Sequence, residues 1–301
     1  MKKTISVVIT AFNVGKTLER TLKSVTWADE IIVTDGSSTD NTASVARKFT
    51  KKVFTQPNYP MLNKNKNYGF TKATGDWILC LDSDEEIPPL LAKEIRQKIQ
   101  SDNTVGYWIP RKNIIFGKWI KHGLWWPDRQ LRLFQRGKGK YPEKHVHEYI
   151  SVEGPTTDLS NVYVHYNYES IDMYLWKMQH IYTGSEVENF IAAGNVVRWY
   201  DAIRFPVSDF LKIYFAQEGY KDGLHGLVLS ILQAFYSFIV FAKLWERQKF
   251  DDIDVPLSAS VTELKAVVRD TRYWILTSKI KHTAFPRSLW YRILRRLTTS
   301  S

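Results

Sequence analysis

The 301-residue chain has a single cysteine, Cys80. One cysteine cannot form an intramolecular disulfide or supply a cysteine-based zinc site. The first residues include two lysines but lack the long apolar segment and small-residue cleavage site of a signal peptide. We therefore expect a protein of the reducing cytoplasm that is not exported.

Two common phosphate-binding motifs are also missing. Gly15, Lys16 and Thr17 match the end of a P-loop. The first glycine of that motif would fall on Thr10, where a β-branched residue cannot form the Gly-rich turn around the phosphates. No G-x-G-x-x-G follows the first apolar run, so the dinucleotide-binding fingerprint is missing as well. A nucleotide bound by this chain must be held in another way.

Apolar and basic residues are plentiful. Hydrophobic residues make up 44% of the chain and aromatic residues 14%, which is enough for one large or two ordinary domains with hydrophobic cores. Lysine and arginine number 42 against 31 acidic residues, a formal net charge of +11. Such a surface attracts nucleic acid, phosphorylated small molecules or acidic lipid, and composition alone does not choose among them.

The first hundred residues alternate short β-rich runs with helical patterns, which predicts βα units and a mainly parallel sheet flanked by helices. The expected strands cover residues 5–10, 30–35, 51–54 and 76–81. Strands and loops rich in Trp, Tyr and Arg follow, and helices dominate after residue 171. We predict an α/β catalytic domain over residues 1–165 and a helical region over residues 166–301.

Two segments of the C-terminal region suggest contact with a membrane. Residues 226–245 are the most apolar stretch, but their unbroken apolar reach falls short of the roughly 20 residues that a span requires. We expect a buried or interfacial helix there. Residues 271–301 carry seven basic residues and no acidic one, interleaved with apolar residues in SLWYRILRRL. This pattern is typical of a helix on an anionic membrane, and a solvated basic face is the alternative.

Polar residues follow three of the expected strands at the point where each ends. Thr10 and Asn13 follow the first strand, Asp35 closes the second, and Asp82 and Asp84 follow the fourth. Ligands of open α/β sheets bind outside the carboxyl ends of the strands, so we expect these groups to face one crevice. Asp35 either accepts a hydrogen bond from a uracil ring or simply opens a turn, and these residues do not decide between the two.

The segment ILCLDSDEEI contains four acidic residues within five positions. Strand geometry would put Asp82 and Asp84 on the same side, where two carboxylates repel unless a cation lies between them. Oxygen ligands select Mg²⁺ or Mn²⁺, which bind through one or two carboxylates plus substrate phosphates. Glu85 and Glu86 are interpreted as first-turn acids that stabilise the N-terminus of the helix that follows.

Four segments together resemble the family 2 glycosyltransferases of the GT-A fold, which is Rossmann-like, and in particular the lipopolysaccharide core β-glucosyltransferase group. They are ISVVITAFN, EIIVTDGSSTDNT, KNYGFTKATGDWILCLDSDE and RQLRLFQRGKGKYPEKHVHE. The resemblance covers roughly residues 4–240. It departs from the group's pattern at DGSS, where the order D-S-G-S is more common.

The resemblance implies an inverting, metal-dependent transfer of a hexose from a nucleotide sugar, a UDP-hexose, to a saccharide or glycolipid acceptor. By match of motif, it implicates these residues in binding the nucleotide sugar: Ala11, Phe12, Asn13, Asp35, Lys66, Asn67 and Asp82. The D-x-D pair, Asp82 and Asp84, would hold the metal, Mg²⁺ or Mn²⁺, together with the diphosphate.

Direct displacement with inversion also needs a base for the acceptor hydroxyl. Glu148, in a V-H-E stretch that matches the acceptor-side motif of the group, is the first candidate, and Asp128 is the second. His147 either completes the metal site or is only an exposed strand residue. Three arginines of the same part of the chain either bind an anionic group or form a solvated face: Arg129, Arg132 and Arg136.

Two other functions stay open. A nucleotidyltransferase can use the same sheet and metal, but it needs a basic Gly-rich signature after the first strand, and only Gly15 and Lys16 are there. A nucleic-acid-binding protein suits the net charge, but the acidic cluster would repel a phosphate backbone, so we expect no nucleic-acid partner. The expected location is the inner face of the cytoplasmic membrane.

Overall fold

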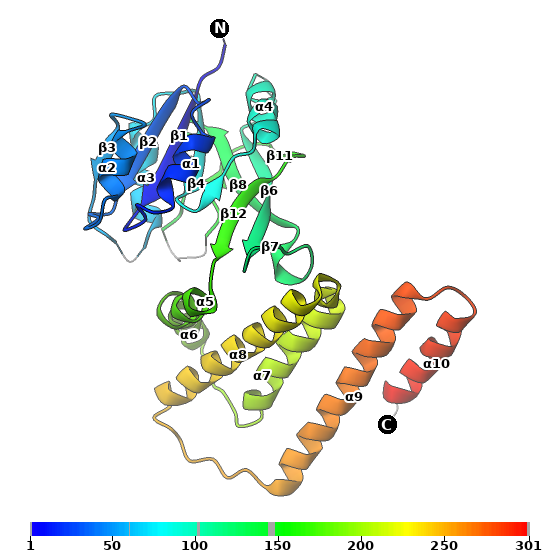
Figure 1. Cartoon of the computed structure of the whole chain (residues 1–301). Coiled ribbons are helices and arrows are strands. Elements are labelled where there is room, and N and C mark those ends of the chain that lie inside the picture. Colours follow the sequence, from blue (N-terminus) through cyan, green and yellow to red (C-terminus); the bar gives the residue numbers. More distant parts are fainter. Residues whose placement is uncertain (1, 60, 101–102, 144–147, 300–301) are drawn as a thin grey trace. The chain divides into compact units, whose positions relative to one another are not determined.

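The computed structural model describes residues 2–59, 61–100, 103–143 and 148–299, and the chain forms two compact units. The first unit comprises Met1–Ile115 and Pro127–Asn167. The second comprises Phe116–Trp126 and Tyr168–Ser301. Figure 1 shows the sheet of the first unit and the helices of the second.

A mixed β-sheet forms the centre of the first unit. Its main strands follow the order β3-β2-β1-β4-β8-β6-β12-β5, and β11 pairs with β6. The bounds are β1 Ile5–Ala11, β2 Glu30–Asp35, β3 Val53–Thr55, β4 Trp77–Asp82, β5 Glu85–Glu86, β6 Gly106–Ile115, β8 Asp128–Gln135, β11 Thr156–Asp158 and β12 Tyr163–Tyr168. A separate two-stranded sheet pairs β9, Gly139–Lys140, with β10, Ser151–Val152.

The N-terminal half of the large sheet is parallel. Strands β3, β2, β1 and β4 all run in the same direction, while β8 runs antiparallel to β4 and β6 antiparallel to β8. All seven residues of β1 are buried, as expected of a parallel strand that is covered on both faces. The predicted α/β class is confirmed. The parallel pairing predicted for the first hundred residues is present, and β11 also pairs parallel with β6.

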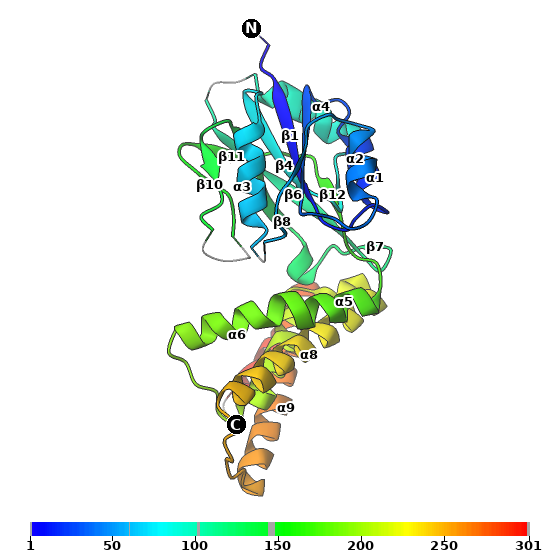
Figure 2. The ribbon, with the colours of Figure 1, turned by 90° about the vertical axis from the view of Figure 1, so that its left-hand side faces the viewer.

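Helices cover both faces of these strands. On one face lie α1 Leu18–Ser24, α2 Thr42–Arg47 and α4 Pro89–Lys98, and on the other lies α3 Asn63–Lys72 (Figure 2). Gly69 lets α3 approach the sheet closely, because a Cβ at this position would lie 2.4 Å from Cγ1 of Val8. This close approach brings Lys66, one turn earlier on the same helix, towards the end of β4.

The register of the parallel strands brings the polar strand ends together. Ala11 pairs with Asp35 on β2, and Thr10 pairs with Asp82 on β4. Strand β1 lies between the other two, so the residues after it and both aspartates lie at one edge of the sheet, as predicted.

The acidic segment after β4 folds differently from its prediction. The strand ends at Asp82, Ser83 and Asp84 form a turn, and Glu85 and Glu86 form β5, which pairs antiparallel with β12. Helix α4 begins only at Pro89, and its first turn reads PLLA. The interpretation of the two glutamates as first-turn acids is therefore wrong, and so is the strand geometry assumed for the two aspartates. The physical reason is that Glu85 is buried beside an arginine.

The second unit is mainly helical. Its helices are α5 Ile171–Lys177, α6 Thr183–Ala192, α7 Asp201–Leu211, α8 Leu224–Arg247, α9 Leu257–His282 and α10 Arg287–Thr299. Short elements connect or precede them: strand β7 Lys118–Trp119, 3-10 turns Gly123–Trp125 and Gly219–Asp222, and π-helical turns Met178–Tyr182 and Lys212–Ala216. Helices α7 and α8 pack side by side, and α9 and α10 form a hairpin (Figure 1).

Helix α8 contains the apolar stretch noted in the sequence. Among the described residues, it alone is long and apolar enough to cross a membrane by length and composition, and 28% of its most apolar window is buried. Ser230 and Ser237, two of its polar residues, are buried within the unit. These two hydroxyls face protein, and the buried or interfacial position of the helix stays a prediction.

A half-buried carboxylate joins several strands at the opposite edge of the sheet. Glu30, at the start of β2, accepts hydrogen bonds from the Ser6 hydroxyl, from Nζ of Lys52, and from the backbone N–H and hydroxyl of Thr74, both at 2.9 Å. Burial alone would raise the pKa of Glu30, but the bonds from Lys52, Ser6 and Thr74 outweigh it and lower the pKa to about 2. Glu30 therefore ties β1, β2 and the loop before β4 together.

The substitution Glu30→Gln is expected to lower the free energy of unfolding by about 2 kcal/mol at pH 7, since hydrogen bonds to a charged group each contribute this order of energy. The folded-state pKa lies below the unfolded value, so this stabilisation is complete above about pH 4.5 and is lost as the pH falls towards 2. Denaturant unfolding of both proteins between pH 7 and pH 2.5 measures the difference, with Glu153→Gln, an exposed site, as control. A difference that stayed constant to pH 2.5 would contradict the assignment.

Candidate active site

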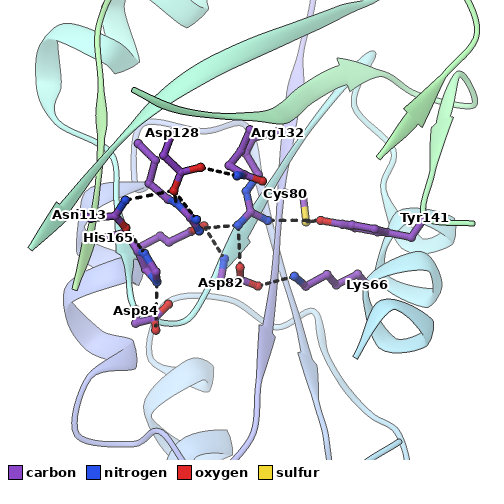
Figure 3. A network of polar contacts seen from close by, with 12 residues as sticks. Lys66, Cys80, Asp82, Asp84, Asn113, Asp128, Arg132, Tyr141 and His165 are labelled. Atoms are coloured by element: carbon purple, nitrogen blue, oxygen red, sulfur yellow. Dashed lines mark hydrogen bonds and ion pairs between the residues drawn. The ribbon is translucent and has the colours of Figure 1, made fainter. Parts of the chain in front are cut away.

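Four charged side chains meet at the end of β4 (Figure 3). Nζ of Lys66 lies 2.6 Å from Oδ1 of Asp82. The guanidinium of Arg132, on β8, donates through Nη2 to Oδ2 of Asp82 and to Oε1 of Glu85, both at 2.7 Å. The side chains of Arg132 and Glu85 are 5% and 0% exposed. The group contains two acids and two bases, so its formal charge is balanced.

The same residues close the turn after β4. Oε2 of Glu85 accepts a hydrogen bond from the backbone N–H of Asp82 at 2.8 Å. Glu85 therefore binds the start of the turn directly and, through Arg132, the side chain of Asp82. Sequence reasoning missed this arrangement, because Arg132 was interpreted as an anion-binding or solvated residue.

Burial and pairing act in opposite directions on these groups. Burial raises the pKa of Asp82, but the charges of Lys66 and Arg132 outweigh it and hold that pKa well below its usual range. Burial would lower the pKa of Lys66, and the charge of Asp82 more than offsets this, so its pKa lies above the usual value. Asp82 is therefore ionised, and the protein itself supplies cations to both of its oxygens.

A second chain of polar contacts leads away from Asp84 (Figure 3). Oδ2 of Asp84 lies 3.6 Å from Nε2 of His165, and Nδ1 of His165 lies 2.8 Å from Oδ1 of Asn113. Nδ2 of Asn113 donates to Oδ2 of Asp128 at 3.1 Å. Because the amide nitrogen of Asn113 is directed at a carboxylate, its oxygen faces the ring, and this assigns the proton to Nδ1 of His165. Nε2 is then the ring nitrogen of His165 that faces Asp84.

Asp128, the second candidate for the base, lies within an ion pair. It accepts hydrogen bonds from Nε of Arg111 at 2.7 Å and from Nε2 of Gln130 at 2.7 Å, in addition to that from Asn113. Burial raises the pKa of Asp128, but the charge of Arg111 and these hydrogen bonds outweigh it and lower the pKa below its usual value. A carboxylate held in this way is a weak proton acceptor.

The two aspartates of the D-x-D motif differ in their capacity to hold a metal ion. No group of three or more Asp, Glu, His or Cys side chains within the described ranges is arranged to hold one. Mg²⁺ and Mn²⁺ need only one or two protein ligands when substrate phosphates complete the shell. The two side chains are about equally exposed, 30% for Asp84 and 31% for Asp82, and Asp84, which faces Nε2 of His165, fits such an ion. Asp82 already has a protein cation at each oxygen.

The loops after β1 and β2 are bound to each other. The backbone N–H of Ser38 lies 3.3 Å from both carboxylate oxygens of Asp35, which is 3% exposed. Oδ1 of Asn13 accepts from the backbone N–H of Thr39 at 2.8 Å. Ala11 is buried and Phe12 is exposed. These predicted nucleotide-binding residues therefore lie together in one ordered pair of loops.

The order of residues in DGSS places a serine, Ser37, where the more common order has glycine. Ser37 has a φ of 62°, in the left-handed region that favours glycine. In the more common order D-S-G-S, glycine would occupy this position. The hydroxyl of Ser37 donates to the backbone oxygen of Gln56 at 2.8 Å, a bond that glycine cannot make.

Asn67 binds the segment that leads to Glu148. Its Nδ2 donates to the backbone oxygen of Tyr141 at 2.9 Å, and its Oδ1 accepts from the backbone N–H of the same residue at 2.9 Å. Oε2 of Glu148 accepts from Nδ2 of Asn63 at 3.1 Å and from the backbone N–H of Glu143 at 2.8 Å. Helix α3 thus carries partners for this segment and for Asp82. His147 lies outside the described residues.

One pattern in the sequence indicates the polar residues of β12, which the sequence analysis did not select as site residues. In β12, alternate residues Tyr163, His165 and Asn167 are all buried, so polar side chains recur on one face of a strand, which marks a polar interior. The burial of Arg132 had no such sign. Of its neighbours, Arg129 pairs with the exposed Asp158, and Nε of Arg136 donates to the backbone of Gly75.

Comparison with known proteins identifies the family. Residues 6–152 match the model of Glycosyl transferase family 2. The chain is similar to LpsC of Rhizobium meliloti, a lipopolysaccharide core biosynthesis glycosyltransferase, with 25% identity over 253 residues that cover 82% of this chain and 93% of that protein. A Campylobacter jejuni GalNAc(5)-diNAcBac-PP-undecaprenol beta-1,3-glucosyltransferase is 38% identical over 93 residues, 28% of this chain and 30% of that protein.

Among solved structures, that of S. aureus TarS 1–349 in complex with UDP aligns over 84% of this chain and 94% of that one, with a TM-score of 0.43 and 15% identity. The family match confirms the resemblance found in the sequence, and the α/β sheet agrees with the GT-A class that it implied. The chain is a glycosyltransferase, and residues 6–152 form its glycosyl transferase family 2 domain.

Proposed function

We propose that the chain transfers a hexose, with inversion, from a UDP-sugar to a saccharide or glycolipid acceptor of the lipopolysaccharide core or another cell-envelope glycan. The observation that carries the proposal is the convergence of Asp35, the Lys66–Asp82 pair and Asp84 at one edge of the sheet. The names of the relatives support the substrate class. One acts in lipopolysaccharide core synthesis, and the other is a glucosyltransferase for an undecaprenol-linked glycan.

The loops after β1 and β2 would hold the uridine. Asp35 is a buried carboxylate at the edge of the sheet, suited to accept the N3–H of uracil, and Ala11, Phe12 and Asn13 lie beside it in the adjoining loop. Lys66 offers a positive charge next to Asp82, where the ribose and diphosphate would follow. Asn67 acts through the backbone of Tyr141 rather than on the donor.

Asp84 and His165 would hold Mg²⁺ or Mn²⁺, which when bound supplies a Lewis acid for the departing diphosphate. The hydrogen bond between Nδ1 of His165 and Asn113 orients the imidazole, as the outer partners of ligating histidines commonly do. Asp82 would orient Lys66 and contact the donor instead of the ion. His147 stays a sequence prediction.

Glu148 is proposed as the base for the acceptor hydroxyl. The two hydrogen bonds described above reach the same oxygen, Oε2, and come from neutral donors on Asn63 and Glu143. Asp128, in contrast, faces the charge of Arg111. This ion pair makes Asp128 the weaker candidate, and Glu148 keeps the place that the acceptor-side motif gave it.

The hairpin of α9 and α10 would bind the anionic inner face of the cytoplasmic membrane. Helix α10 exposes apolar side chains at helical spacing: Leu289, Trp290, Ile293 and Leu297. Arg292 and Arg296, one turn apart, are also exposed on this helix. An apolar stripe flanked by basic residues suits the boundary between lipid headgroups and acyl chains.

The substitution Asp84→Asn is expected to lower Mn²⁺-dependent transfer from a UDP-hexose by about 100-fold or more, the size of effect seen when one stabilising contact to a developing charge is lost. Donor hydrolysis or transfer is measured with Mn²⁺ and with EDTA, which is expected to abolish turnover of the unmodified protein. The exposed site variant Asp158→Asn is the control. Full metal-dependent turnover by Asp84→Asn would refute the metal assignment.

The substitution Glu148→Gln is expected to lower kcat by roughly 10²- to 10⁴-fold, because it removes the proton acceptor while the amide keeps the size of the side chain. Binding of UDP with Mn²⁺, measured by calorimetry, is expected to stay unchanged, as it should in the control Glu153→Gln. If Glu148→Gln keeps its kcat while a folded Asp128→Asn loses it, the base is Asp128.

The double substitution Arg292→Gln/Arg296→Gln is expected to weaken binding to phosphatidylglycerol vesicles about 30-fold, because each basic residue near an anionic surface contributes about 1 kcal/mol. Cosedimentation with these vesicles and with neutral phosphatidylcholine vesicles measures the change. Lys93→Gln/Lys98→Gln on α4 removes the same charge as a control. Equal binding by the two double variants would show that α10 is not the anchor.

A further inference from the structure

The turn between β4 and β5 is held by hydrogen bonds from neighbouring elements. The backbone oxygen of Ser83 accepts from the hydroxyl of Thr21 at 2.9 Å, and that of Asp84 accepts from the backbone N–H of Tyr166 at 3.0 Å. Glu85 binds the N–H of Asp82. The backbone of the turn is therefore fixed, while the carboxylate of Asp84 remains partly exposed.

Glu85 and Arg132 stand out among these groups. A carboxylate with no exposed surface is costly to bury, and a hydrophobic pair of similar volume often stabilises a fold as well or better. A contribution to stability alone therefore does not explain the ion pair of Glu85 and Arg132. Its geometry does what a hydrophobic pair cannot: one guanidinium nitrogen orients the carboxylate of Asp82, and the partner carboxylate orients the N–H of the same residue.

The position of Glu85 in the sheet also connects it to His165. Glu85 pairs with His165 in the register of β5 and β12, and Asp84 directly precedes it. The two-residue strand β5 therefore fixes the position of Asp84, which would hold the metal ion. It also pairs with β12, the strand that carries His165. A shift of Glu85 would change the 3.6 Å separation between Asp84 and His165.

We propose that Glu85 and Arg132 are positioning residues for glycosyl transfer. They contact neither donor nor acceptor, and they hold the turn from Asp82 to Glu85 so that Asp84 faces His165 and Asp82 faces Lys66. This inference rests on the proposed function, because it assigns them to the same metal and donor site.

The test measures Mn²⁺-dependent UDP binding by calorimetry, transfer kinetics and the melting temperature for variants of the full chain. Glu85→Gln is expected to raise the half-saturating Mn²⁺ concentration about tenfold or more and to lower kcat. Glu94→Gln is the matched control. Glu94 also accepts hydrogen bonds, from Ser160 and Asn161, and lies on α4 away from the site, so its loss should lower the melting temperature without changing Mn²⁺-dependent UDP binding.

A second variant separates positioning from stability. Glu85→Met/Arg132→Met replaces the ion pair by apolar side chains and is expected to keep the melting temperature within a few degrees of the parent or to raise it. Its UDP affinity in Mn²⁺ is still expected to fall tenfold or more. A folded double variant with parental affinity and kcat would overturn the proposal.

Asp84→Asn distinguishes this proposal from the one on which it rests. If Asp84→Asn lowers Mn²⁺-dependent UDP affinity but Glu85→Gln does not, only the positioning role is refuted. If Asp84→Asn leaves that affinity unchanged, the metal site and the positioning role are both wrong. A loss in both variants, with Glu94→Gln unaffected, supports both proposals.

Discussion

The guanidinium of Arg132 is shared between Asp82 and Glu85, and this contact holds the turn after β4. A buried acid is tolerated only when a cation and hydrogen bonds satisfy it, so Arg132 allows the chain to place the fully buried Glu85 beside Asp82. Arg132 lies on β8, the first antiparallel neighbour of the parallel strands. The contact therefore joins the two halves of the sheet where their strand direction changes, and Asp82 and Lys66 lie beside the same junction.

The sequence predicted a metal cation between the acidic residues, and the structure has two basic side chains beside Asp82. Repulsion between carboxylates was a sound reason to expect positive charge, but Lys66 and Arg132 meet that need at Asp82. In the proposed function the divalent ion would therefore be held at Asp84, which faces the imidazole of His165. The two aspartates of the D-x-D motif therefore have different partners: Asp82 contacts Lys66 and Arg132, and Asp84 faces His165.

The parallel strands and their polar ends could be predicted from the sequence, because β1, β2 and β4 are continuous apolar runs that end in Asn, Asp or Gly. The short strand β5 could not. Two residues have no periodicity, and the partner strand lies about 80 positions later, with Tyr166 donating to Glu86 across that separation. The burial of Arg132 also depends on that distant pairing. The local pattern therefore predicted that the polar residues meet at one edge of the sheet, while long-range pairing determines the contacts of each carboxylate.

The serine in the left-handed turn after β2 has an entropic consequence. A glycine at position 37 would leave the loop free to visit many backbone conformations before a ligand arrives. Ser37 restricts that freedom, and its hydroxyl is bonded to the chain beyond β3. The conformational entropy of ordering the loop is then lost during folding and not at the moment of binding, so a ligand that contacts this loop meets a surface already in its final shape.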